Sequence, residues 1–144
     1  MFYVNVEGAV YKENKWLIIE RSMKEGHAGG LLSFVGGTVE NEGNSTDILE
    51  RTLRRELFEE VGVKVKEKME YVRNTSFKLD DSSEVIDIVY LCELEEGEPF
   101  PKSPEEVAAV YWMTTDEIVH HPKTPIWLMD SIKEAEKLLK NKSF

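Results

Sequence analysis

The segment Arg-Glu-Leu-Phe-Glu-Glu-Val-Gly-Val, residues 55–63, combines an apolar helical pattern with three closely spaced glutamates and a terminal glycine. Toward the N-terminus the apolar pattern continues with a period of four residues, at Leu49, Leu53, Leu57 and Val61. This spacing predicts a helix over about 46–61 whose apolar stripe packs on a sheet. One of residues 44–46 would cap its start, and Gly62 follows its end.

Three glutamates lie on one side of this predicted helix. Glu56 follows Leu49 by about two turns, so it points in nearly the same direction as the apolar stripe and should lie at the edge of the core. Glu59 and Glu60 follow three and four residues later, which brings the three carboxylates within reach of one another. This arrangement favours a bound divalent cation, with Arg55 orienting Glu56. A solvated acidic helix end linked by salt bridges is the alternative.

A pair of glycines precedes the helix. Gly36 and Gly37 follow the strand-like run over 32–35. Two successive glycines allow backbone carbonyl oxygens to approach a ligand or a metal closely. A glycine turn alone would carry no function, but next to the acidic helix the pair favours a site for metal and phosphate.

The remaining elements predict one mixed α/β domain covering residues 1–144, with helices packed against a mixed sheet. A second helix is expected over 126–140, where apolar residues recur at helical spacing, and a short helical turn is expected to start at Thr114. Runs rich in β-branched and aromatic residues predict further strands over 2–11, 16–20, 63–78, 85–94 and 107–113.

The composition bounds what the chain binds. With 28 acidic and 18 basic residues its formal net charge is −10, which argues against a nucleic-acid polymer as partner and requires cations to bridge the protein to a polyphosphate. A charge that serves solubility alone is the alternative. Cys92 is the only cysteine, which excludes an internal disulfide. Neither a membrane span nor a signal peptide is recognisable, so we expect no membrane partner and a cytoplasmic location.

Residues 36–40, the predicted helix and residues 55–63 together resemble the signature of the Nudix hydrolases. The second half of that signature is Arg-Glu-aliphatic-any-Glu-Glu-any-Gly-aliphatic, and residues 55–63 fit it at every fixed position. Gly37 and Arg55 are four residues further apart than in the usual signature. The resemblance therefore implies an insertion in the turn at 41–44, with Asp47 at the place of an early glutamate.

The resemblance implies an α/β/α sandwich around a mixed β-sheet and hydrolysis of a nucleoside diphosphate linked to another group. Glu56, Glu59 and Glu60 match the metal ligands of the family, Arg55 matches its orienting arginine, and Gly37 matches a position whose carbonyl joins the metal shell. Mg²⁺ is the implied cofactor, with Mn²⁺ as a substitute. The substrate would be a nucleoside triphosphate, a nucleotide sugar such as ADP-ribose, or a dinucleoside polyphosphate.

Other residues are candidates for substrate binding and proton transfer. Arg21, which follows a strand, would contact a substrate phosphate together with the glycine pair, although a surface role is the alternative. The general base would be a helix glutamate, Glu59 or Glu60, or a loop carboxylate. Glu106 is our loop candidate and Glu105 is almost its equal, with an exposed loop acid as the alternative for both. A module that binds nucleotides without hydrolysis is the competing function, and a homodimer is left open.

Overall fold

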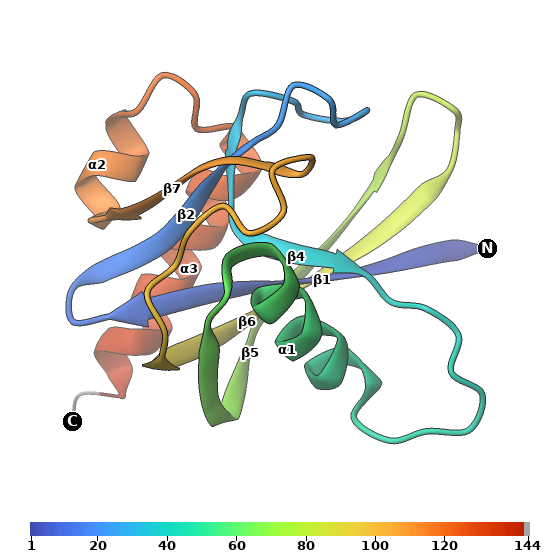
Figure 1. The fold of residues 1–144 in the computed structure, drawn as a ribbon, viewed down its shortest axis with the longest axis horizontal. Helices are drawn as coiled ribbons and strands as arrows, with labels where there is room; N and C mark the ends of the chain where they lie inside the picture. Colours follow the sequence, from blue (N-terminus) through green and yellow to red (C-terminus); the bar gives the residue numbers. More distant parts are fainter. Residues whose placement is uncertain (143–144) are drawn as a thin grey trace.

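The computed structural model describes residues 1–142 and is built on a seven-stranded sheet with the order β3-β2-β1-β6-β5, in which β4 also pairs with β1 and β7 with β2 (Figure 1). The long central strand β1 runs parallel to β6 and antiparallel to β2 and β4. The mixed sheet predicted from the sequence is therefore confirmed. Its strands are β1 Phe2–Lys12, β2 Lys15–Arg21, β3 Leu32–Ser33, β4 Val35–Thr38, β5 Lys64–Lys78, β6 Glu84–Glu96 and β7 Val107–Met113.

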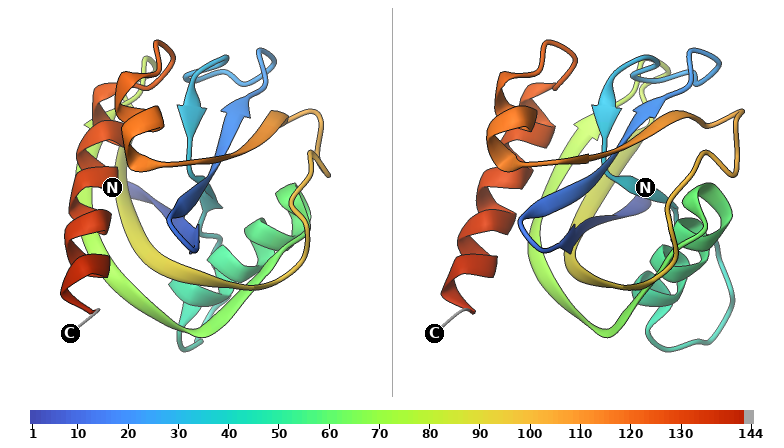
Figure 2. Two further views of the ribbon diagram at one scale, coloured as in Figure 1. Left: turned by 90° about the vertical axis from the view of Figure 1, so that its left-hand side faces the viewer. Right: turned by 60° about the vertical axis from the view of Figure 1, so that its left-hand side comes forward.

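Helices cover both faces of the sheet. Helix α1 (Ile48–Val61) lies on one side, and α3 (Ile126–Asn141) lies on the other, with the short α2 (Thr115–His120) beside it (Figure 2). A capping box between Thr114 and Glu117 starts α2, as the sequence predicts. The arrangement is the expected α/β/α sandwich. Within the described residues, no helix is long and apolar enough to cross a membrane.

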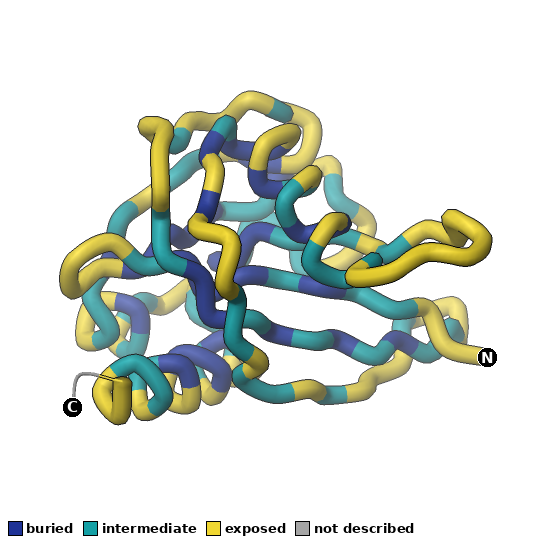
Figure 3. The backbone as a smooth tube through the Cα atoms, turned by 90° about the horizontal axis from the view of Figure 1, so that it is seen from below, coloured by how far each residue is buried: buried dark blue, intermediate teal, exposed yellow. Residues whose placement is uncertain are grey.

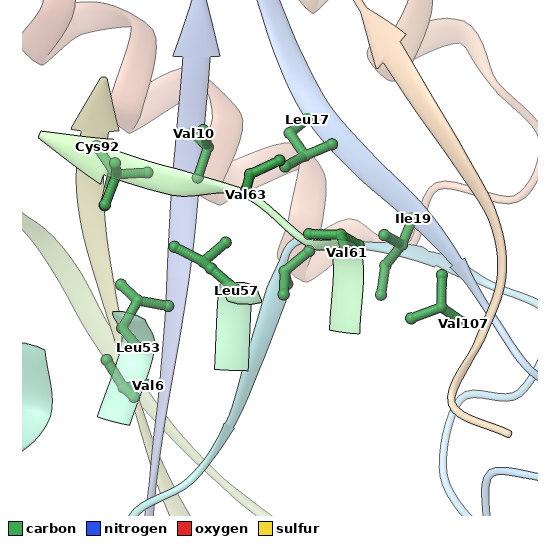
Figure 4. Packing of buried hydrophobic residues seen from close by; sticks show 12 residues of the cluster. Val6, Val10, Leu17, Ile19, Leu53, Leu57, Val61, Val63, Cys92 and Val107 are labelled. Carbon is green, nitrogen blue, oxygen red and sulfur yellow. The ribbon is translucent and has the colours of Figure 1, made fainter. Parts of the chain in front are cut away.

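Two apolar clusters, one on each face, hold the layers together, and the buried segments run through the middle of the molecule (Figure 3). On the α1 side, Leu53, Leu57 and Val61 pack against β1 and β2, as predicted from their spacing (Figure 4). On the other side, Leu128 and Ile132 of α3 pack against the sheet. Helix α1 is thus fixed by its apolar stripe, and its polar side is free to carry chemistry.

The start of α1 differs from the prediction. The helix begins at Ile48 rather than near residue 46, because Asp47 takes a left-handed conformation with φ of 56°. In the part of the chain that the structure describes, no side chain caps this helix N-terminus. Instead Arg51 reaches back to the preceding loop, where its guanidinium bonds Glu42, Ser45 and the carbonyl of Thr46.

The glycine pair also lies differently from the prediction. Gly36 and Gly37 are inside strand β4 rather than in a turn after a strand, because the predicted strand over 32–35 divides into β3 and β4. Glu7 of β1 pairs with Gly36 and Val6 pairs with Gly37. The pair is therefore held flat against the central strand, and the connection to α1 begins only after Thr38, extending outward from the sheet (Figure 1).

Candidate active site

A cleft of about 290 Å³ opens between β1, β4, the α1 glutamates and the loop before β7. We call it the acidic cleft. It brings together six of the eight residues predicted for the site, although they come from four separate parts of the chain. These six are Arg21, Gly36, Gly37, Glu56, Glu60 and Glu106.

Glu56 packs so closely against Gly37 that the space there cannot hold a larger residue than glycine. A Cβ atom placed on Gly37 would lie 2.5 Å from Cδ of Glu56. At Gly36 the same atom would lie 2.2 Å from the carbonyl oxygen of Val6. The two glycines therefore allow β4 to lie between β1 and the carboxylate of Glu56, which forms a cradle at the head of the cleft.

Glu60 is the most buried acidic residue that lines the acidic cleft, with 5% of its surface exposed. Burial, a hydrogen bond to Glu56 and the charges of Glu56 and Glu106 raise its pKa to about 10, and Arg21 partly opposes this. The raised pKa keeps a proton on Glu60 at neutral pH, and Glu60 donates this proton in its hydrogen bond to Glu56. A cation at this place would replace that proton and neutralise both carboxylates.

Glu59 and Arg55 flank the acidic cleft without lining it. The Nη1 atom of Arg55 donates to Glu56 Oε1 at 3.0 Å and to Glu59 Oε2 at 3.2 Å. One arginine thus holds two of the three helix glutamates, and the Glu59 side chain keeps 54% of its surface exposed. Glu56 and Glu60 therefore line the acidic cleft, whereas Glu59 lies on the adjoining side of α1, outside the cleft lining.

The structure distinguishes the two loop acids. Both are exposed, but only Glu106 lines the acidic cleft, and it accepts a hydrogen bond of 3.3 Å from the Ser103 hydroxyl. The carbonyl of Glu106 also accepts from the amide of Ser22 at 2.9 Å. This bond joins the Glu106 loop to the segment that follows Arg21.

Arg21 enters the acidic cleft from the end of β2. Its Nε donates to the carbonyl oxygen of His27 at 3.1 Å, and its Nη2 lies 3.6 Å from Glu25 Oε2. These contacts fold the loop after β2 back over the strand end. They leave Arg21 as the cation that faces Glu60 across the cleft.

Sequence reasoning missed several residues that line the acidic cleft. Glu7 and Glu40 are among them, and Asp87 lies directly behind Glu7. Burial and the adjacent carboxylate of Asp87 raise the pKa of Glu7 well above its ordinary value. The signal in the sequence is an acidic residue inside an otherwise apolar strand, as at Glu7 between Val6 and the run over 8–10.

The residues of the acidic cleft fit a divalent cation by their chemistry. Their candidate metal ligands are carboxylate and carbonyl oxygens. Glu56 and the protonated Glu60 lie beside the Gly37 cradle, and a cation bound there would take the place of the proton between the two carboxyl groups. Among residues 1–142, no group of three or more His, Cys, Asp or Glu side chains is arranged to hold a metal ion, so the side chains would have to move to bind one. Asp47, which the resemblance puts at the place of an early glutamate of the signature, lies at the start of α1, outside the cleft lining.

Fold and cleft define a class of protein, an α/β/α sandwich with an acidic helix beside a glycine pair. The profile of the NUDIX domain matches residues 1–133. The chain therefore belongs to the NUDIX domain family. No curated protein sequence gives a match.

Solved structures with this fold are similar over nearly the whole chain. A MutT NUDIX hydrolase from Burkholderia pseudomallei gives a TM-score of 0.78 at 21% identity, covering 93% of this chain and 98% of that one. A MutT protein from Methanosarcina mazei Go1 gives 0.78 at 19% identity over 96% of both chains. The NUDIX domain of Shewanella oneidensis NrtR, complexed with ADP ribose, gives 0.76 at 17% identity over 96% of this chain and 89% of that one. At these identities the likeness is one of fold.

Proposed function

We propose that this protein hydrolyses the pyrophosphate linkage of a nucleoside diphosphate derivative with the help of a divalent cation. The observation that carries the proposal is the convergence of Glu56, Glu60, Glu106 and Arg21 beside the glycine pair in one cleft. The substrate classes are nucleoside triphosphates, ADP-ribose and other nucleotide sugars, and dinucleoside polyphosphates. The ADP ribose complex of the NrtR domain, which shares the fold, supports including the second class.

The cation belongs on the acidic helix. Glu56, Glu59, Glu60 and the carbonyl oxygen of Gly37 would hold it, and oxygen ligands of this kind suit Mg²⁺, with Mn²⁺ as a substitute. When bound, the cation neutralises phosphate charge and makes water easier to deprotonate. A net charge of −10 makes this neutralisation necessary, because the protein alone would repel a polyphosphate.

The remaining residues bind the substrate and move the proton. Arg21 binds a phosphate, since a guanidinium can donate two parallel hydrogen bonds to phosphate oxygens. Glu106 accepts the proton of the attacking water and is oriented by the Ser103 hydroxyl. Arg55 keeps Glu56 and Glu59 in place through its two hydrogen bonds. We propose a small-molecule substrate in the cytoplasm as the setting of this reaction.

A substrate screen tests the proposal. The purified protein is incubated with the three substrate classes and Mg²⁺, Mn²⁺ or EDTA, and the products are separated by chromatography. We expect metal-dependent release of a nucleoside monophosphate. Tight binding of a substrate without turnover would instead support a nucleotide-sensing module on this fold.

A matched pair of variants tests the role of Glu106. E106Q removes the carboxylate that faces the acidic cleft, whereas E105Q changes the adjacent, exposed acid. Loss of a general base typically lowers turnover by about 10²- to 10⁴-fold, so we expect this for E106Q and near wild-type turnover for E105Q. Equal activity of the two variants would contradict the assignment of the base.

A further inference from the structure

The loop that carries Glu106, residues 97–106, connects β6 to β7 and passes the C-terminal end of α1 (Figure 2). Its backbone is bonded to that helix end. The amides of Lys102 and Ser103 both donate to the carbonyl oxygen of Glu60, at 3.0 and 3.4 Å. The loop is therefore docked on the same residue whose carboxyl group lines the acidic cleft.

Phe100 packs on the turn that ends α1. Its amide donates to the carbonyl oxygen of Val61 at 3.1 Å. Its ring lies against Gly62, where an added Cβ would come within 2.8 Å of the ring atom Cε1. Although 51% of the surface of Phe100 is exposed, the part of the apolar ring that the helix end covers favours the docked position of the loop.

Lys102 makes a second side-chain contact with α1. Its Nζ atom lies 3.5 Å from the centroid of the Phe58 ring. The face of an aromatic ring attracts an ammonium group, and at an exposed site this attraction changes an equilibrium by a factor of about 2 to 5. Lys102 does not line the acidic cleft, so this contact holds the loop and does not bind a substrate phosphate.

The loop is stiff between these contacts and Glu106. Prolines at positions 99, 101 and 104 each fix one backbone dihedral angle. The amide of Glu106 donates to the carbonyl oxygen of Ser103 at 3.0 Å, and the Ser103 hydroxyl donates to the Glu106 carboxylate. Since the loop has little freedom of its own, its docking on α1 determines where the carboxylate of Glu106 lies.

We propose that Phe100 on Gly62 and Lys102 on Phe58 form a latch, and that Phe100 and Lys102 are positioning residues for Glu106. The latch holds the Glu106 carboxylate at a fixed place in the acidic cleft, opposite the glutamates of α1. This inference rests on the proposed function, because it takes Glu106 as the general base. Neither latch side chain of the loop lines the cleft, so both act only through the loop.

Hydrogen exchange followed by NMR tests the latch without requiring turnover. The variant K102M keeps an unbranched side chain but removes its charge. We expect the protection factors of the Phe100 and Ser103 amides, which correct for intrinsic exchange rates, to fall by about 2- to 5-fold. K102R should restore them, because a guanidinium also stacks on an aromatic face. Unchanged protection in K102M would overturn the latch.

Steady-state kinetics test the positioning role. In K102M/F100A both latch contacts are lost, and we expect kcat to fall by about 10-fold with little change in KM, because a slightly misplaced catalytic group slows the chemical step. K140M removes the charge of an exposed lysine on α3 and is the control, with kcat as in the wild type. Equal kcat values for K102M/F100A and K140M would overturn the proposal.

The E106Q background separates positioning from a general loss of structure. If the latch acts through Glu106, adding K102M/F100A to E106Q should lower kcat by less than about 2-fold, because the group that the latch positions is already lost. A further fall of about 10-fold in that background would show that the latch residues act by another route and would overturn the proposal.

The two proposals fail separately. If turnover depends on metal and on Glu106 while K102M/F100A turns over like the wild type, the function stands and the latch has no positioning role. If the wild type hydrolyses no substrate, the proposed function fails, and the exchange measurement still decides whether the latch holds the loop.

Discussion

At the scale of single residues, the acidic cleft depends on the contact between Gly37 and Glu56. Glu56 fills the space that a side chain would need at Gly37, and it accepts a hydrogen bond from Glu60 on its other side. Arg55 fixes the carboxylate from outside. The position of Glu56 is therefore determined by three neighbours, and each can be changed separately.

A methyl group at Gly37 should displace Glu56. In G37A the added Cβ would lie 2.5 Å from Cδ of Glu56, so the carboxylate must move away from its place in the cleft. A misplacement of about 1 Å can cost about 100-fold in rate, and we expect turnover to fall by about that factor. G26A, whose added Cβ meets no atom within 4 Å, is the control. Turnover in G37A close to that of G26A would disprove the cradle.

Glu60 should make the metal-free protein less stable as pH rises. The unfolded chain releases this proton near pH 4.5, whereas the native protein holds it to about pH 10. The native state binds the extra proton between these values, so the contribution of Glu60 to stability is complete below about 4.5 and is lost as the pH approaches about 10. The slope for one such group is at most about 1.4 kcal/mol per pH unit.

Denaturant unfolding in EDTA across this pH range checks the prediction. E60Q should flatten the decline, because its amide carries no titratable proton, and E105Q on the exposed loop serves as control. Identical pH dependence in E60Q and wild type would show that Glu60 is ionised in the native state.

At the scale of secondary-structure elements, helix α1 is firmly packed, whereas the connection that precedes it is mostly exposed. Helix α1 is anchored by its apolar stripe, and Gly62 ends it in a left-handed conformation with its amide bonded to the last turn. The connection over 39–47 is exposed along most of its length and is tied mainly by Arg51. Only Glu40 of this connection lines the acidic cleft.

Shortening this connection should separate cation binding from substrate choice. Deletion of residues 41–44 removes the turn that the family resemblance identifies as inserted and leaves Glu40, β4 and α1 unchanged. We expect the affinity for Mn²⁺, measured by calorimetry, to stay near the wild-type value while the order of preferred substrates changes. A collapse of Mn²⁺ affinity would mean that the loop belongs to the metal site.

The sequence predicts the two helices and most strands because each has its own periodic signal, but it does not predict how distant strands pair. The acidic helix was predictable down to Glu56 at the edge of the core, since one helix fixes its own geometry. Glu7 and Asp87 were not, because they meet only through the parallel pairing of β1 with β6, where Asn5 lies opposite Asp87.

At the scale of the whole molecule, the sheet separates two cores, and only one of them holds the helix that carries the site glutamates. The cluster on one face holds α1 and therefore the glutamates of the acidic cleft. The cluster on the other face holds α3 and therefore Trp127. Loss of packing on either face should lower the stability of the protein, but only loss of packing on the α1 face should directly displace the glutamates.

A pair of core variants tests this division. Leu57 and Ile132 are both fully buried, on opposite faces of the sheet, so L57A and I132A should each lower the free energy of unfolding by about 2–5 kcal/mol. L57A should also lower turnover, since Leu57 lies next to Glu56 on α1, whereas I132A should retain it. Urea unfolding and steady-state rates on the same samples measure both effects. Equal losses of turnover would contradict the division.

The parallel pairing of β1 with β6 also has a consequence for synthesis on the ribosome. Phe2 pairs with Glu84 and Tyr11 with Glu93, so β1 finds its parallel neighbour only after residues of β6 have left the exit tunnel. Contacts of such long sequence separation form slowly, because a large loop must first close, at a cost in chain entropy, before the contacts stabilise the fold. Strands β2 and β4 can pair with β1 early, but the edge of β1 that faces β6 stays open until β6 has been made, and a partner that shields this edge should raise the yield of folded protein.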